Sequence, residues 1–280
     1  ADVDTAEFEP AEIESAEIES AEIESAEIES ARQQGGAPLA PDSLDASTLL
    51  PPMPVGTDRT NRIPPPREGT WFWYVVWGIA WVLRLFCARL VAEGRNNLPR
   101  QGGYVVTCNH TRGFDFVPLG YCTPRQIYFM VKAEAFESNP ILAWVLRSGG
   151  GMPVNRGKAD TNAVHMAIAK VEAGYPVAIF PEGTRSPNGA LQAAYTGAVR
   201  IALHTRAPIV PAVVIGAEEM LAQMRKPWVR PLVTVRYAAP MTVTGDPGDK
   251  EQVAAETRRV MLAMAAMLPP NMRGVWADGV

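Results

Sequence analysis

Residues 161–186 read TNAVHMAIAKVEAGYPVAIFPEGTRS, and this stretch holds a helix, a strand and a turn in succession. Apolar residues at positions 163, 164, 167, 168 and 171 share one helical face, and Asp160 or Thr161 can cap its first turn. The glycine and the proline of the following AGYP end the helix. The apolar run Val177–Phe180 then has the length of a buried strand. A helix that leads directly into a buried strand is typical of α/β domains.

The same alternation continues on both sides of this stretch. We expect further strands at Tyr104–Cys108, Ile127–Val131, Pro208–Ile215 and Pro231–Tyr237, and further helices at Ala190–Thr205 and Asp249–Leu268. Strands that alternate with helices predict an α/β fold with a largely parallel sheet flanked by helices. The proline within Ile209–Val213 indicates an edge strand or a bend, because proline cannot donate a sheet hydrogen bond.

The chain of 280 residues divides into an acidic N-terminal part and a basic remainder. Residues 1–70 contain 16 acidic and 4 basic residues, whereas residues 71–280 contain 14 and 22. Residues 11–30 are four copies of Ala-Glu-Ile-Glu-Ser, and this five-residue period gathers no apolar face in a helix or a strand. We therefore predict a disordered acidic tail and a proline-rich linker over residues 1–70, and a folded domain over residues 71–280. The tail is interpreted as a solubilising segment or an acidic interaction arm.

Charge and composition narrow the function classes. The basic residues 71–280 favour anionic partners, which include phosphates, nucleic acid and anionic membrane surfaces. Three cysteines are too few for a disulfide scaffold, and Cys87, Cys108 and Cys122 lack any CxxC spacing, so we predict buried thiols. A single long apolar run excludes a protein with several membrane-spanning helices.

That apolar run begins immediately after the proline-rich segment. Residues 71–83 read WFWYVVWGIAWVL and carry no charge. Trp73, Trp77 and Trp81 recur every four residues on one helical face, as expected for rings at the headgroup level of a membrane. We predict a membrane-surface anchor helix over residues 71–92. A spanning helix and a buried core helix remain alternatives, because the uncharged run is shorter than the ~20 residues that cross a bilayer.

The loop after the strand Tyr104–Cys108 carries the first candidate catalytic group. In α/β sheets, ligands bind beyond the carboxyl ends of the strands, and here the sequence NHTRGFD occupies residues 109–115. A carboxylate at Asp115 can return to the ring of His110 if the loop turns. It would then fix the tautomer and leave the other ring nitrogen as a proton acceptor. This pair is a candidate general base, although a structural His–Asp pair has the same spacing.

The turn after Val177–Phe180 carries the second candidate group. Residues 181–186 read PEGTRS, which offers backbone amides, the Thr184 hydroxyl and the Arg185 guanidinium to an anion such as a phosphate. Glu182 could orient Arg185 or hold a substrate hydroxyl. The glycine-rich run at residues 149–156 ends in Arg156 and could add a cation, but it matches no nucleotide-binding spacing.

Four blocks in this order resemble the glycerolipid acyltransferase family. Asn109–Asp115 is similar to the family's NHxxxxD block, and Gly151–Arg156 is similar to a second block that ends in arginine. Phe180–Ser186 matches the FPEGTRS block, and Ile209–Val213 is similar to a fourth block that contains a proline.

The resemblance implies an enzyme that transfers an acyl group from a coenzyme A or acyl-carrier-protein thioester to a lipid hydroxyl. The implied acceptor is 1-acyl-glycerol-3-phosphate, which would become phosphatidic acid. His110 would be the general base and Asp115 its orienting partner. The residues implied in acceptor binding are Asn109, Arg156, Glu182, Gly183, Thr184 and Arg185. No metal, resident cofactor or nucleic-acid partner is expected. The expected location is the cytoplasmic face of the cell membrane.

The sequence also departs from the family in one informative place. Ala194, Tyr195 and Thr196 stand where a Phe-Lys pair often precedes a glycine, so a lysine that could neutralise a phosphate is missing. Another lysolipid or an amino-acid lipid is therefore an alternative acceptor. A catalytically silent membrane-surface adaptor is a third alternative, against which the intact His110 and Asp115 argue.

Overall fold

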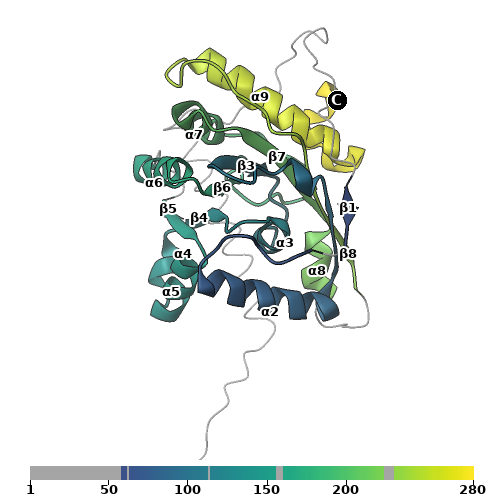
Figure 1. The fold of residues 1–280 in the computed structure, drawn as a ribbon. Helices are drawn as coiled ribbons and strands as arrows, with labels where there is room; N and C mark the ends of the chain where they lie inside the picture. The colour runs from purple at the N-terminus through teal and green to yellow at the C-terminus, as the bar shows by residue number, and fades with distance from the viewer. Residues whose placement is uncertain (1–57, 62, 113, 156–159, 224–229) are drawn as a thin grey trace, which may run out of the picture.

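The computed structural model describes residues 58–61, 63–112, 114–155, 160–223 and 230–280 (Figure 1). The predictions for the acidic repeat and for Arg156 lie outside these residues. The described strands form one sheet of eight strands in the order β1-β2-β8-β7-β3-β6-β4-β5. Their bounds are β1 Arg59–Thr60, β2 Arg89–Glu93, β3 Tyr104–Cys108, β4 Tyr128–Lys132, β5 Gly151–Val154, β6 Pro176–Ile179, β7 Ile209–Ile215 and β8 Leu232–Tyr237.

The sheet is largely parallel, which confirms the predicted fold class. The five neighbouring strands β7, β3, β6, β4 and β5 run in one direction. β8 is antiparallel to β7 and parallel to β2, and β1 closes the other edge as an antiparallel strand. The loops after β3 and β6 therefore leave the same end of the sheet from adjacent strands.

Helices cover both faces of this sheet (Figure 1). One face carries α6 Thr161–Glu172, α7 Gly197–Thr205 and α9 Lys250–Met267, and the other carries α2 Trp71–Cys87, α3 Phe116–Cys122 and α8 Ala217–Gln223. The short helices α4 Glu134–Glu137 and α5 Pro140–Ser148 lie beside the β5 edge. Short 3-10 helices are η2 Arg95–Asn97, η3 Pro270–Met272 and η4 Gly274–Gly279.

Two apolar cores result from the alternation of side chains along the strands. In β3, Val105 belongs to the core under α6, α7 and α9, whereas Val106 and Cys108 belong to the core under α2 and α3. Strands with both faces buried read as continuous apolar runs, and this is the pattern that reveals them in the sequence.

Most of the predicted elements are present, and the differences have local causes. The helix expected from Ala190 begins only at Gly197, because residues 190–192 bond to other parts of the chain instead. β7 is an interior strand, so the prediction that its proline marks an edge is wrong. Pro211 pairs with Thr107 of β3, and its carbonyl accepts the amide of Ala238 at 2.9 Å.

The predicted anchor helix is shorter than expected and is oriented differently. It ends at Cys87, and residues 89–93 form β2 within the sheet instead of its continuation. Trp73 is buried, and Trp77 stacks on Tyr121 with ring centroids 5.1 Å apart, so these two tryptophans face the body of the protein. Within the described part of the chain, no helix combines the length and the apolar character that crossing a membrane requires.

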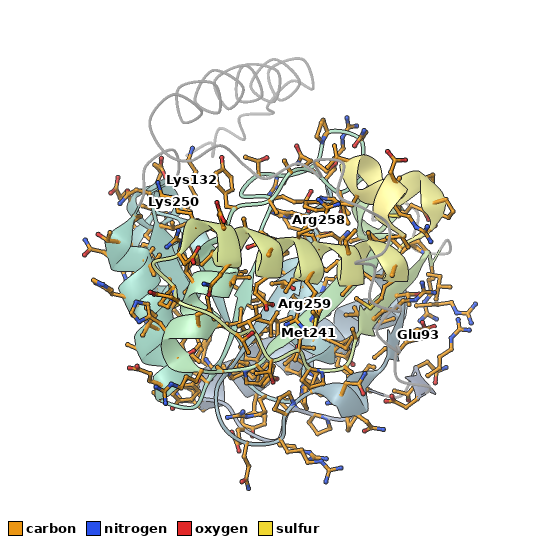
Figure 2. The ribbon with its side chains drawn as sticks, turned by 90° about the horizontal axis from the view of Figure 1, so that it is seen from above. Glu93, Lys132, Met241, Lys250, Arg258 and Arg259 are labelled. Carbon is orange, nitrogen blue, oxygen red and sulfur yellow. The ribbon has the colours of Figure 1, made fainter. Side chains whose placement is uncertain are left out.

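Residues 58–61 and 63–70, which the sequence assigns to the linker, include side chains that contact the folded body. Glu93 of β2, labelled in Figure 2, forms two ion pairs. Its Oε1 lies 3.2 Å from Nε of Arg59, and its Oε2 lies 2.7 Å from Nε of Arg236. Glu68 forms an ion pair with the buried Arg125, whose Nε lies 2.9 Å from Oε2 of Glu68. The folded part of the chain therefore begins before residue 71.

Candidate active site

Two loops at the carboxyl end of the sheet form the candidate site. β3 and β6 are adjacent and parallel, so the loops that follow them meet. The amide of Ser186 donates to the carbonyl of His110 at 2.8 Å, which joins the two loops directly. The structure thus brings together two blocks that are about 70 residues apart in the sequence, as the sequence analysis expects.

The predicted pair of His110 and Asp115 is formed. Nδ1 of His110 lies 2.9 Å from Oδ2 of Asp115, whose side chain is fully buried. Thr111 completes the arrangement, because its amide donates to Oδ2 at 2.8 Å and its hydroxyl donates to Oδ1 at 2.6 Å. Each of the two carboxylate oxygens therefore has a donor, which holds the carboxylate in place. The sequence analysis did not single out Thr111.

The ring of His110 has one further neighbour and a restricted opening to solvent. It stacks on Phe180 at the end of β6, with ring centroids 4.3 Å apart. Its side chain is only 10% exposed. With Nδ1 donating to Asp115, Nε2 carries the lone pair and is the ring atom that can accept a proton. Phe180, which belongs to the FPEGTRS block, thus packs against the ring of His110.

Glu182 makes two backbone contacts that the sequence did not predict. Its Oε1 accepts the amide of His110 at 2.7 Å, and its Oε2 accepts the amide of Gln192 at 2.9 Å. Burial raises the pKa of this carboxyl to about 7, and the two amides oppose the rise because they favour the ionised form. Glu182 therefore holds the backbone of the loop after β3.

Asn109 likewise bonds to the backbone of a neighbouring strand. Its amide nitrogen donates to the carbonyl of Val214 at 3.0 Å, and its amide oxygen accepts the amide of Val214 at 2.7 Å. The residue is 2% exposed. This reciprocal pair joins the end of β3 to β7 and fixes where the loop begins.

The remaining predicted acceptor residues lie in the turn after Glu182. Gly183 has a φ of +73°, and a β-carbon there would lie 2.8 Å from the ring of Tyr195, so a glycine is required. Thr184 is partly exposed and Arg185 is exposed. The side chains of Thr184 and Arg185 are therefore accessible in the turn that Ser186 joins to the His110 backbone. Arg156, the other predicted cation, lies outside the described residues.

One carboxylate near the site was missed by the sequence analysis. Glu218 is in the first turn of α8, directly after β7, and is partly buried. Burial raises its pKa, Asp115 raises it further, and Arg112 and the Thr111 hydroxyl lower it, so its carboxylate lies close to the loop after β3. In α/β sheets, ligand sites lie just beyond the carboxyl ends of the strands. Glu218 could have been predicted from this rule, because α8 starts two residues after the end of β7.

The site offers general-base chemistry and no activated thiol. Burial raises the pKa of the Cys108 thiol well above its usual value, and Asp115 and Glu182 raise it further. The side chain lies in the core under α3, which confirms that Cys108 is a buried thiol. A neutral thiol is a poor nucleophile, so His110 is the group suited to activate a hydroxyl.

Comparisons with known proteins agree with this geometry. A family model described as Acyltransferase matches residues 89–215. The 1-acyl-sn-glycerol-3-phosphate acyltransferase of Bacillus subtilis (strain 168) is 34% identical over 119 residues, which make up 42% of this chain and 58% of that protein. The alpha form of this enzyme from Homo sapiens is 25% identical over 196 residues, 68% of each chain.

A solved structure has the same fold. The crystal structure of the 1-acyl-sn-glycerophosphate (LPA) acyltransferase PlsC from Thermotoga maritima matches with a TM-score of 0.53 and 23% identity. The match covers 67% of this chain and 76% of that one. Residues 89–215 therefore resemble an acyltransferase domain, both in the family model that they match and in the relatives with which they align.

Proposed function

We propose that this protein transfers a fatty acyl group from a thioester to the free hydroxyl of 1-acyl-glycerol-3-phosphate and so produces phosphatidic acid. The observation that carries this proposal is the bond of 2.9 Å between Nδ1 of His110 and Asp115, which leaves Nε2 as a proton acceptor. The names of the two curated relatives agree with this acceptor.

The proposed reaction needs only groups that the chain supplies. Nε2 of His110 takes the proton of the acceptor hydroxyl while the oxygen attacks the thioester carbonyl. Asp115 stabilises the imidazolium that forms. The tetrahedral intermediate then collapses, the carbon–sulfur bond breaks, and the proton on Nε2 passes to the leaving thiolate. No covalent acyl-enzyme is needed, and the donor is a coenzyme A or acyl-carrier-protein thioester.

The test is thiol release by the purified protein from palmitoyl-coenzyme A, with and without lysophosphatidic acid. We expect release that requires the lysolipid and yields phosphatidic acid. The same assay with a palmitoyl acyl-carrier-protein distinguishes the two donors. If neither donor releases thiol with this acceptor, the proposed acceptor is wrong.

The acceptor phosphate is proposed to bind at the turn that carries Thr184 and Arg185. Arg185 is exposed beside the site and offers a planar pair of donors, which suits a phosphate. We expect Arg185→Ala to raise the KM for lysophosphatidic acid roughly tenfold, because a charge-assisted hydrogen bond contributes about 1.5–3 kcal/mol. The KM for the acyl donor should change much less. An unchanged acceptor KM would assign the phosphate to another cation.

A second acceptor class is favoured by one observation. Beside this turn the chain has Ala194, which is fully buried, and Tyr195, which packs over Gly183, and neither supplies a cation, whereas Glu218 adds a carboxylate near the site. A lysolipid with a cationic headgroup would suit that arrangement. A screen in the same assay of lysophosphatidic acid against lysophosphatidylethanolamine and lysophosphatidylcholine decides between the two classes.

The membrane surface is proposed to contact the outer face of α2. Among the described side chains of this helix, the large apolar ones that are at least one third exposed are Trp71, Tyr74, Val75, Val76, Ile79, Trp81 and Val82. α5 extends this face, because Phe72 and Trp144 pack with ring centroids 5.0 Å apart. Contact through this face, on the cytoplasmic side, would bring lipid acceptors to the protein.

We expect Ile79→Glu to weaken binding to vesicles of anionic phospholipid by about tenfold or more, because it places a charge on the apolar face. Ile79 is 54% exposed, so the substitution leaves the core intact. Val280→Glu is the matched control, since Val280 is 47% exposed and lies at the other end of the chain. Sedimentation with vesicles measures the effect. Equal binding of both variants would refute a contact through α2.

A further inference from the structure

The C-terminal segment of the chain packs against the stretch that follows the candidate site. The amide of Leu191 donates to the carbonyl of Met272 at 2.9 Å, and the amide of Val275 donates to the carbonyl of Leu191 at 3.3 Å. Gly274 has a φ of +55°, and a β-carbon there would lie 1.9 Å from the Leu191 carbonyl oxygen. The two backbones therefore approach as closely as only glycine permits.

Trp276 is the centre of this contact. It is fully buried, and its indole nitrogen donates to the carbonyl of Gln192 at 2.8 Å. The amide of Gln192 in turn donates to Oε2 of Glu182, whose Oε1 accepts the amide of His110. Three successive side-chain-to-backbone contacts thus connect the C-terminal segment to the backbone of the catalytic histidine.

We propose that Trp276 is a positioning residue for His110, and that the C-terminal segment acts as a clamp on the catalytic loop through Gln192 and Glu182. This inference rests on the proposed acyl transfer for its effect on rate, but the contacts themselves do not. The residue lies outside the segment that matches the family model, so that match does not assign it a role.

The clamp acts because Glu182 is buried and needs both of its amide donors. Without the indole donor, the Gln192 carbonyl loses this hydrogen bond, and Gln192 keeps the bond of its amide to Glu182 and the neighbouring contacts of Leu191 with Met272 and Val275. Any displacement of Gln192 removes one of the two donors to Glu182. Of its two amide donors, Glu182 then keeps that of His110, and the carboxylate that holds the His110 backbone is itself held less firmly.

Trp276→Phe tests this in the full chain, because phenylalanine keeps an aromatic ring in the core and removes the indole donor together with part of the ring volume. We expect kcat to fall about tenfold, with the acceptor KM changed less than twofold. The acid limb of the kcat profile should move to higher pH, since the Gln192 amide favours ionised Glu182. A merely structural role of Trp276 would lower the temperature of unfolding without moving this limb.

Hydrogen exchange gives a readout that does not depend on activity. We expect the amides of His110 and Gln192 to exchange at least tenfold faster in Trp276→Phe, while those of α6 exchange at the wild-type rate. Tyr104→Phe is the control, because Tyr104 is fully buried at the opposite end of β3 and its hydroxyl has no partner among the described residues. It should leave both amides unchanged.

The two outcomes are distinguishable from a failure of the proposed function. Wild-type rates of exchange at His110 and Gln192 in Trp276→Phe would overturn the clamp, whether or not the protein transfers acyl groups. Faster exchange in a protein that accepts no lysolipid would support the clamp and refute the proposed activity. Faster exchange with an unchanged kcat would overturn the positioning role.

Discussion

His110→Ala should lower acyl transfer at least 10²-fold and as much as about 10⁴-fold, the range that general-base catalysis typically contributes. The alanine cannot take the proton from the acceptor hydroxyl, and no other described side chain bonds to Asp115 apart from Thr111. The KM for the acceptor should change little, because the proposed phosphate contacts lie in the turn after Glu182. Steady-state thiol release from the acyl donor measures both constants.

The matched control is His165→Ala. His165 is exposed on α6, on the face of the sheet that carries α7 and α9, so its loss should leave turnover unchanged. Circular dichroism and thermal unfolding show whether each variant folds. The buried Asp115 keeps both Thr111 donors in His110→Ala, so the loop retains its main contacts. A folded His110→Ala protein that still transfers acyl groups at the wild-type rate would refute the mechanism.

Glu182→Gln should have the second-largest effect, although this residue does not touch the reacting atoms. Glutamine has one acceptor oxygen for two amides, so either the His110 amide or the Gln192 amide would face a donor. A buried unpaired amide costs about 1–3 kcal/mol. We therefore expect unfolding at lower denaturant concentration and a fall in kcat of about 10²-fold. Glu172→Gln, an exposed position at the end of α6, is the control.

The pH dependence of the Glu182 variant has a definite sign. Because the folded protein raises the pKa of this carboxyl to about 7, protonation stabilises the fold. The contribution is fully present below the ordinary pKa of about 4.5 and is lost as the pH rises through about 7. Wild-type stability should therefore fall by about 3 kcal/mol relative to Glu182→Gln across this range. Urea unfolding at several pH values measures the difference, and parallel curves would contradict the raised pKa.

The same titration should affect activity in the opposite direction. Below about pH 7, a protonated Glu182 has one oxygen that carries a hydrogen and no longer accepts an amide well, so the hold on the His110 backbone weakens. Stability and turnover should thus change in opposite senses between about pH 5 and 7. This behaviour is typical of a site in which ionisation of a buried group serves function at the expense of stability.

The fold class and the two sequence blocks of the candidate site follow from the sequence alone. Strands such as β3 and β6, buried on both faces, must be continuous apolar runs, and the amphipathic α6 must show a 3.6-residue period. The adjacency of the first and third blocks also follows, because neighbouring parallel strands end on the same side of the sheet. The pairing of His110 with Asp115 needed only a turn between them.

Other features depended on contacts between distant residues, and local patterns do not record them. Residues 89–93 continue the apolar run of α2, and only pairing with β8 makes them a strand. The spacing of Trp73 and Trp77 suits a membrane-facing surface and a core-facing surface equally well. Packing against α3 places both tryptophans toward the core. Pro211 can lie in the middle of the sheet because its carbonyl accepts the amide of Ala238. This contact does not need the amide hydrogen that proline lacks.

The roles within the site were also decided by the tertiary structure. Sequence analysis could name Asn109 and Glu182 but assigned them to the substrate, because a polar side chain in a loop has no visible partner in the sequence. The structure gives them backbone partners 105 and 72 residues away, and it gives Glu182 a further one in Gln192. A residue type and its spacing determine which chemistry is available, whereas the burial of a polar group determines which backbone groups it must satisfy.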